Sequence, residues 1–183
     1  MELQKRAVRR VAAVVVGGLL LAACSPQPTP PPPAPAPVTT PVETQLERQQ
    51  RLDFEAAEKS YRAFHSEYTR LSQSGGTRQP TAVMKLEAGG PYLQFMADYL
   101  AQTQAAGTRA KGVVNITYVR PGVYSPTALD LQICEDGSNV TNVNRQGEVI
   151  SRGVAVRLRL DVHRVGNKWK VWDGDDEEVT TCG

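Results

Sequence analysis

The sequence predicts an α+β domain in which helices come first and an antiparallel sheet follows. Two observations support this class. Between positions 54 and 107, apolar residues recur every three or four positions, as they do on one face of an α-helix. From Gly112 onward, apolar and polar residues alternate, as they do in a strand with one buried face. Helices followed by neighbouring strands are typical of domains whose helices gather on one face of a sheet.

Residues 1–23 have the composition of an export signal. Four basic residues precede an apolar stretch over Val11–Leu21. A helix of that length would be about 16 Å long, too short to cross a hydrocarbon core of about 30 Å. The stretch ends in the letters LAAC at positions 21–24, where leucine occupies a position at which an ordinary signal peptidase requires a small residue.

These four letters resemble the bacterial lipobox. In proteins with that motif, the cysteine is alkylated with diacylglycerol and the chain is cut just before it. The resemblance implies that Cys24 becomes a lipidated first residue that anchors the chain in the cell membrane, because two acyl chains supply the two signals that stable attachment requires. An uncleaved anchor and a plain secreted protein with a spare thiol are the alternatives. Arg9 and Arg10 also leave the twin-arginine export route open.

Residues 24–41 are expected to form a proline-rich spacer. Nine of the 13 prolines lie between Pro26 and Pro41. The fixed φ of proline favours polyproline II, so the segment would extend about 50 Å and lift a domain off the bilayer. A proline-motif ligand for a peptide-binding module is the alternative. Residues 42–183 then form one domain, with enough chain for a single core.

The first helix is expected to begin at positions 40–43, whose letters TPVE have the form of a capping box with proline at the first helical position. Ser74-Gly75-Gly76 is expected to end it. Its apolar stripe consists of Phe54, Ala57, Tyr61, Phe64, Tyr68 and Leu71. We interpret this stripe as core packing, with the lining of a ligand cavity as the alternative.

Two more helices are expected before the first strand. A short one covers positions 80–86, and Gly90-Pro91 opens another that runs to Gly107. The apolar face of this last helix consists of Tyr92, Phe95, Met96, Tyr99 and Leu100.

Strands are expected at positions 113–119, 129–133 and 153–165. In the longest run, one face carries Val154, Val156, Leu158, Leu160 and Val162, and the other carries Arg157, Arg159, Asp161 and His163. One side should therefore pack on the helices while the other meets water. Gly166-Asn167 is expected to be a two-residue hairpin turn, which places Trp169 and Val171 on the buried side.

The order of these elements, the Gly-Asn hairpin and the Lys-Trp-Lys-Val-Trp strand after it resemble the nuclear transport factor 2-like, or SnoaL-like, cone fold. The similarity covers residues 43–182 and includes the letters CEDGS at 134–138 and Cys182. More narrowly, the chain is similar to small lipoproteins and secreted proteins of high-GC Gram-positive bacteria with that fold. The superfamily includes cyclases, dehydratases, isomerases and members that only bind or scaffold, so the resemblance selects no function.

Cys134 and Cys182 remain once Cys24 is lipidated, and an oxidising compartment favours a disulfide between them. Closing a loop of about 49 residues contributes roughly 4 kcal/mol in the chain-entropy model. Metal ligation and a reactive thiol are the alternatives. Neither cysteine has a Cys or His partner at ligand spacing, so no metal site is expected.

No catalytic residue and no cofactor are expected. A cone-fold enzyme places a His or Asp base in the pocket between helices and sheet. His163 falls on the outward face of its strand, and His65 lies beside the helical stripe, so both should be structural or solvated. Asp98 and Asp130 alternate away from their apolar neighbours. The acidic run over 173–178 lacks the EF-hand spacing and is expected to be a solvated turn.

One surface suggests an interface. The outward strand face combines cations with an exposed aromatic side chain, in Arg157, Arg159, His163, Lys170 and Trp172. This composition is found at protein interfaces, although an ordinary solvated strand face has it too. Loss of residues 1–23 leaves 17 basic and 18 acidic residues, so no nucleic-acid partner is expected.

The sequence therefore predicts a lipid-anchored lipoprotein on the outer side of the cell membrane, non-enzymatic, that binds an envelope protein or a small apolar ligand. The alternatives are a SnoaL-like enzyme or lipid-ligand carrier that uses the cavity between helices and sheet, and a tethered structural or phage-exclusion role. A cavity with a buried His or carboxylate favours catalysis, and a wholly apolar one favours a carrier. A filled cavity beside an exposed Trp172 favours a binding module.

Overall fold

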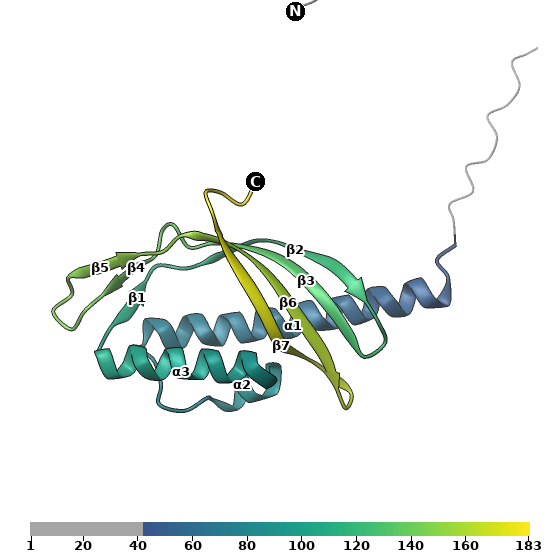
Figure 1. The fold of residues 1–183 in the computed structure, drawn as a ribbon, viewed down its shortest axis with the longest axis horizontal. Helices are drawn as coiled ribbons and strands as arrows, with labels where there is room; N and C mark the ends of the chain where they lie inside the picture. Colours follow the sequence, from purple (N-terminus) through teal and green to yellow (C-terminus); the bar gives the residue numbers. More distant parts are fainter. Residues whose placement is uncertain (1–41) are drawn as a thin grey trace, which may run out of the picture. The chain divides into compact units, whose positions relative to one another are not determined.

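The computed structural model describes residues 42–183. The expected signal peptide, Cys24 and the proline-rich spacer lie outside the described residues. Three helices precede seven strands (Figure 1), which confirms the predicted α+β order. The elements are α1 (Gln45–Gln73), α2 (Ala82–Glu87), α3 (Gly90–Ala106), β1 (Arg109–Lys111), β2 (Asn115–Tyr124), β3 (Ala128–Asp136), β4 (Thr141–Val143), β5 (Val149–Arg152), β6 (Ala155–Val165) and β7 (Lys168–Val179).

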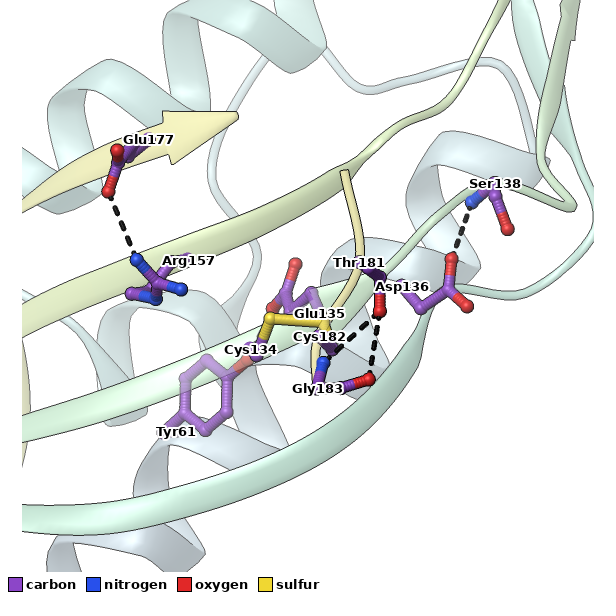
Figure 2. The surroundings of a disulfide bond; sticks show 10 residues. All are labelled: Tyr61, Cys134, Glu135, Asp136, Ser138, Arg157, Glu177, Thr181, Cys182 and Gly183. Carbon is purple, nitrogen blue, oxygen red and sulfur yellow. Dashed lines mark hydrogen bonds and ion pairs between the residues drawn. A yellow bond between two sulfur atoms is a disulfide. The ribbon is translucent and has the colours of Figure 1, made fainter. Parts of the chain in front are cut away.

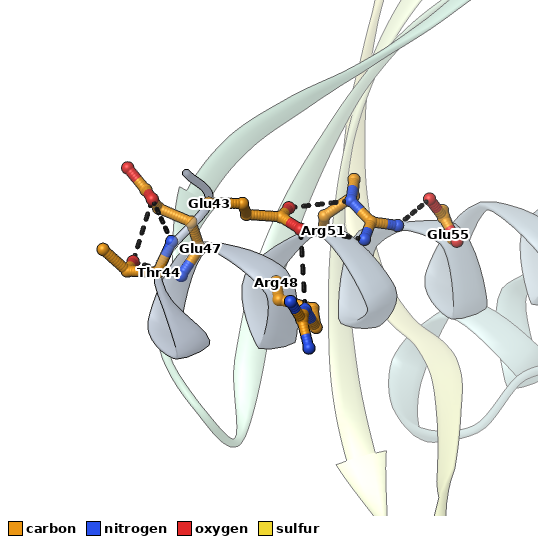
Figure 3. Close-up of polar contacts among 6 residues, drawn as sticks. All are labelled: Glu43, Thr44, Glu47, Arg48, Arg51 and Glu55. Carbon is orange, nitrogen blue, oxygen red and sulfur yellow. Dashed lines mark hydrogen bonds and ion pairs between the residues drawn. The ribbon is translucent and has the colours of Figure 1, made fainter. Parts of the chain in front are cut away.

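The prediction for the start of α1 was wrong by one helical turn. The capping box is formed by Thr44 and Glu47: the Thr44 hydroxyl accepts from the Glu47 amide at 3.2 Å, and the Glu47 carboxylate accepts from the Thr44 amide at 2.8 Å (Figure 3). The same Thr-x-x-Glu spacing occurs at positions 40–43, but the Glu43 side chain accepts from Arg51 at 2.9 Å instead of capping the helix.

The predicted stripe of α1 lies in the core. Ala57, Tyr61, Phe64 and Leu71 are buried, and Phe54 and Tyr68 pack against them. The predicted apolar face of α3 is only partly buried. Leu100 is fully buried, whereas Phe95 and Tyr99 are 66% and 43% exposed, because they border a hollow between α3 and the sheet.

Two antiparallel sheets follow the helices. The larger has the strand order β2-β3-β6-β7, and the smaller has the order β1-β4-β5. The expected long strand at 153–165 is interrupted at its start, because the Gly153 amide donates to the Val140 carbonyl outside the larger sheet and β6 begins only at Ala155. The first predicted strand is also displaced, since β2 begins two residues later than expected and runs on to Tyr124.

The helices cover one face of the larger, curved sheet (Figure 1). Leu129, Leu131 and Ile133 of β3 lie opposite Val162, Leu160 and Leu158 of β6. These six side chains form the sheet half of the core with α1. The period-two alternation predicted for both strands is confirmed there.

The hairpin prediction is confirmed, and the acidic-turn prediction is wrong. Val165 pairs with Lys168 across the Gly166-Asn167 turn, and Trp169 and Val171 are buried.

The acidic run at 173–178 is part of β7, an edge strand that continues to Val179. It lies in the sheet through backbone pairing with β6 from Asp161 back to Ala155, and Arg159 and Arg157 face Asp175 at 2.9 Å and Glu177 at 3.3 Å across the two strands.

A buried carboxylate ties α1 to the sheet. Asp53 is 4% exposed and accepts hydrogen bonds from Gln49 at 3.1 Å, Tyr124 at 2.8 Å and the Trp169 indole at 3.2 Å. Arg164 pairs with the same carboxylate. Burial alone would raise the pKa of Asp53, but these hydrogen bonds together with the Arg164 charge hold it below its usual value.

Candidate functional site

A cavity of about 450 Å³ lies between the helices and the larger sheet. The helices contribute Phe64, His65, Tyr68, Tyr92, Phe95, Met96 and Tyr99. The larger sheet and the residue before β6 contribute Glu135, Val154, Val156, Leu158, Leu160, Gly174, Asp175 and Asp176. The lining is thus mainly aromatic on the helix side, and the opposite side combines four aliphatic residues with three acidic ones and a glycine. Phe64 and Tyr68 of the α1 stripe therefore also line the cavity, which was the alternative role expected for the stripe.

Helical periodicity places these aromatic side chains together. Residues three and four apart share one face of a helix, so Phe64 and Tyr68 of α1 meet Tyr92 and Tyr99 of α3. The Phe64 and Tyr92 rings are 5.2 Å apart, and the Tyr68 and Tyr99 rings are 6.2 Å apart, measured between centroids. Contact between aromatic rings at this range fixes the helix side of the cavity.

Glu135 supplies the polar end of the cavity. It continues the helix-facing alternation of β3, and its carboxylate accepts a hydrogen bond from the Tyr61 hydroxyl. The His65 Nε2 atom lies 3.5 Å from the same Glu135 oxygen, and both side chains are largely buried. Within residues 42–183, that imidazole nitrogen has no hydrogen-bond partner.

Burial determines the protonation of His65 and Tyr61. Burial lowers the pKa of His65, and the opposing effect of the Glu135 charge is too small to reverse this. Burial also raises the pKa of Tyr61, and Glu135 adds to that effect. At neutral pH the imidazole is therefore neutral and the Tyr61 phenol keeps the proton that it donates to Glu135.

The register between β6 and β7 determines which acidic residues of β7 lie on the cavity side of the sheet. Asp176 pairs with Leu158 and therefore lies on the cavity side, whereas Asp175 pairs with Arg159 on the outer side. Gly174 faces Leu160, where a Cβ atom would come within 2.5 Å of the leucine Cδ2 atom. Glycine at this position therefore leaves the sheet wall of the cavity clear.

The expected disulfide joins Cys134 to Cys182, with their Cα atoms 5.7 Å apart (Figure 2). Cys134 precedes Glu135 in β3, so the two side chains point to opposite faces of the sheet. The bond therefore ties the segment after β7 to the central strand β3, directly behind the polar end of the cavity.

The five candidate interface residues do not form one free cationic surface. Arg157 and Arg159 are paired with acids of β7, and Lys170 donates to the Lys85 carbonyl at 2.7 Å. His163 stacks on Trp172 with a centroid distance of 5.3 Å. A role for these residues in partner binding stays a prediction.

Trp172 is half-buried because the register of β7 shifts beside it. Its indole lies over Gly90 at the start of α3, where a Cβ atom would meet the ring at 2.6 Å. Gly90 also has a φ of 55°, which favours glycine. Trp172 thus packs against the helix start instead of projecting from the sheet.

The two residues at the polar end were missed as site residues by sequence reasoning. His65 was expected to be structural or solvated, but it lines the cavity. Glu135 continues the alternation of Leu129, Leu131 and Ile133, so the period-two rule contained the signal for its inward position. Asp98 and Asp130 do not line the cavity.

The described residues contain neither a cluster of metal-binding side chains nor a helix suited to spanning a membrane. Among residues 42–183, no three His, Cys, Asp or Glu side chains are grouped as metal ligands would be. None of the three described helices combines the length and the hydropathy that crossing a bilayer requires.

Comparison with known proteins shows the fold alone. No protein-family model and no curated protein matches the chain. The intermembrane-space region of the chloroplast protein ARC6 matches with a TM-score of 0.50 and 14% identity, over 69% of this chain and 98% of that one. A candidate dehydratase of the NTF2-like family from Streptomyces avermitilis matches with a TM-score of 0.49 and 12% identity, over 72% of this chain and 99% of that one.

A candidate aromatic ring hydroxylase from Novosphingobium aromaticivorans also matches with a TM-score of 0.49 and 13% identity, over 72% of this chain and 92% of that one. At such identities, activity does not follow from likeness. The order of three helices and an antiparallel sheet, with the helices on one curved face, is the order expected of a nuclear transport factor 2-like fold. Residues 42–183 therefore have an α+β fold with helices on one face of a curved antiparallel sheet, and they share this fold with the ARC6 region.

Proposed function

We propose that the domain binds a small, mostly apolar molecule in the cavity between the helices and the larger sheet, and that the chain is a non-enzymatic lipoprotein outside the cell membrane. The aromatic and aliphatic lining of this cavity carries the proposal. Its volume of about 450 Å³ falls within the range of small-molecule sites, which are mostly apolar with a few polar groups. Glu135 and its neighbours supply those polar groups.

Two features support the location outside the membrane. The letters LAAC at 21–24 resemble a lipobox, and the Cys134–Cys182 disulfide suits an oxidising compartment. The proline-rich spacer would hold the cavity away from the lipid headgroups. A domain on such a tether can capture a molecule that reaches the envelope.

Catalysis is the second candidate function, and one observation favours it. The cavity holds a buried imidazole and a carboxylate, which is the arrangement that acid–base chemistry uses. A histidine base is ordinarily oriented by a hydrogen bond to the ring nitrogen that does not face the substrate, and neither ring nitrogen of His65 makes a hydrogen bond within residues 42–183. We therefore rank binding first.

Fluorescence titration tests the binding proposal. The probe is N-phenyl-1-naphthylamine, an uncharged aromatic amine whose emission rises when it leaves water, added to the oxidised full chain carrying Cys24→Ser. We expect saturable binding that Val156→Trp, which fills the cavity, weakens at least about tenfold. Val123→Trp adds the same ring at a 74% exposed position outside the cavity and should leave binding unchanged.

Equal binding by the filled variant and the unfilled chain would overturn the proposal. Catalysis has a separate readout. If a molecule that co-purifies with the chain is chemically altered on incubation and His65→Gln stops the change without reducing binding, the second candidate replaces the first. Mass spectrometry of the released molecule distinguishes the two outcomes.

A further inference from the structure

We propose that the cavity selects an organic cation: a small molecule with an apolar body and an ammonium group placed against Glu135. The inference rests on the proposed function, because it names the ligand class of the same cavity. Three independent features of the lining carry it: the sign of its charges, its aromatic faces and the unused oxygen of Glu135.

The charged groups that line the cavity are acidic. Glu135 and Asp176 contribute carboxylates, and no lysine or arginine of the described chain lines it. Asp175 is paired with Arg159 across the strands, whereas Glu135 and Asp176 have no lysine or arginine partner among the described residues. The neutral His65 does not balance their charge. A partly buried carboxylate without a cation gains most from a ligand that brings one.

The helix side of the cavity offers aromatic faces to a cation. Five of the lining side chains are aromatic rings: Phe64, Tyr68, Tyr92, Phe95 and Tyr99. Burial raises the pKa of Tyr68 and of Tyr92, so both phenols stay neutral. The negative faces of such rings attract ammonium groups, more strongly where water is excluded.

The Glu135 carboxylate has one oxygen left for a ligand. Tyr61 donates to Oε1, and His65 approaches the same oxygen. Within the described chain, Oε2 accepts no hydrogen bond. The Tyr61 contact fixes the carboxylate against β3 and α1, so its second oxygen is held ready for a cation instead of being repositioned on binding. The same acidic lining would repel an anionic ligand.

Competition against the same fluorescent probe tests the inference. The competitors are benzyltrimethylammonium and neopentylbenzene, which have the same shape and differ in replacing the charged nitrogen by carbon. Glu135→Gln keeps an acceptor for Tyr61 and removes the charge. We expect it to weaken the ammonium compound about tenfold and the uncharged analogue less than about twofold.

Two further variants complete the test. Glu177→Gln makes the same charge change on the outer side of the sheet, where the residue pairs with Arg157, and should affect neither competitor. Asp176→Asn, at an exposed strand position, should weaken only the ammonium compound, and it decides the matter if Glu135→Gln does not fold.

The outcomes separate the two proposals. If the fluorescent probe binds in the cavity but the acid-to-amide changes affect both competitors alike, or neither, the cation inference is wrong and cavity binding stands. If the probe does not bind in the cavity, the proposed function fails and the cation inference fails with it.

Discussion

Asp53 and Glu135 are both carboxylates that face the interior, yet their surroundings give them different roles. Asp53 is surrounded by donors: Tyr124 and the Trp169 indole bond to it and Arg164 pairs with it. Together with Gln49, these partners occupy the Asp53 carboxylate within the folded domain. Glu135 has one phenol donor and an unused oxygen. The first is therefore a structural residue and the second is available to a ligand.

Asp53→Asn should destabilise the domain in a pH-dependent way. The folded-state pKa of Asp53 lies below its unfolded value of about 3.9, so its contribution to the free energy of unfolding is present above that pH and is lost as pH falls through the folded-state pKa. We expect a loss of about 3 kcal/mol at neutral pH that shrinks toward zero at low pH. Urea unfolding from pH 7 downward measures it.

Glu55→Gln is the matched control for Asp53→Asn. It removes an acid from the exposed surface of the same helix, where Glu55 pairs with Arg51. Its effect on the free energy of unfolding should stay below about 1 kcal/mol. Equal effects of the two changes, or a constant effect of Asp53→Asn across pH, would contradict the role assigned to Asp53.

Among the elements, β7 owes most to non-local contacts. Its first half is the predicted apolar hairpin strand, but its second half contains the acidic run that local rules assign to a turn. Backbone pairing with β6 holds that half in the sheet, and Arg157 and Arg159 neutralise two of its acids. The Cys134–Cys182 disulfide then fixes the segment that follows it to β3. The part of β7 that borders the cavity therefore depends on the disulfide and on pairing with β6, which lie outside the cavity.

Removing the disulfide should lower stability substantially. We expect Cys134→Ser together with Cys182→Ser to reduce the free energy of unfolding by roughly 4 kcal/mol, because the bond closes a loop with a sequence separation of 48 residues. Denaturant unfolding of the oxidised chain, the reduced chain and the double variant measures it. The reductant should leave the double variant unaffected. An oxidised chain no more stable than the reduced one would contradict this expectation.

Periodicity predicted the elements because it reports burial directly. The α1 stripe and the alternation in β3 and β6 each describe one buried face, and burial against a single core fixed both. The start of α1 escaped prediction because the Thr-x-x-Glu pattern occurs twice within eight residues, at 40–43 and at 44–47. Glu43 bonds to Arg51, so the second Thr-x-x-Glu pattern caps the helix, and residue spacing alone does not predict the Glu43–Arg51 contact.

The candidate site was harder to predict than the fold. The surface expected around Trp172 assumed regular alternation along β7, and the register shift beside Trp172 turns the indole onto Gly90. His65 and Glu135 come from elements 70 residues apart, so their proximity follows from how α1 lies on the sheet and not from either local pattern. Distant packing of this kind is what single-sequence reasoning lacks.

Cys24 lies outside the described residues, and we propose that it anchors the domain to the membrane. Cys24→Ala removes the expected site of lipidation. Since two acyl chains account for stable attachment, we expect the variant to move from the membrane fraction to the soluble fraction. Immunoblotting of fractionated cells measures the distribution, with Cys182→Ser as a control that keeps the anchor. Retention of Cys24→Ala at the membrane would rule out this anchor.

We propose that the cavity between the helices and the larger sheet is the ligand site. Chemical-shift mapping locates the bound molecule, with the ¹⁵N-labelled oxidised chain carrying Cys24→Ser titrated with N-phenyl-1-naphthylamine. We expect shifts concentrated at Phe64–Tyr68, Tyr92–Tyr99 and the facing residues of β6 and β7. Shifts concentrated around Trp172 or outside residues 42–183, with the cavity residues unchanged, would contradict it.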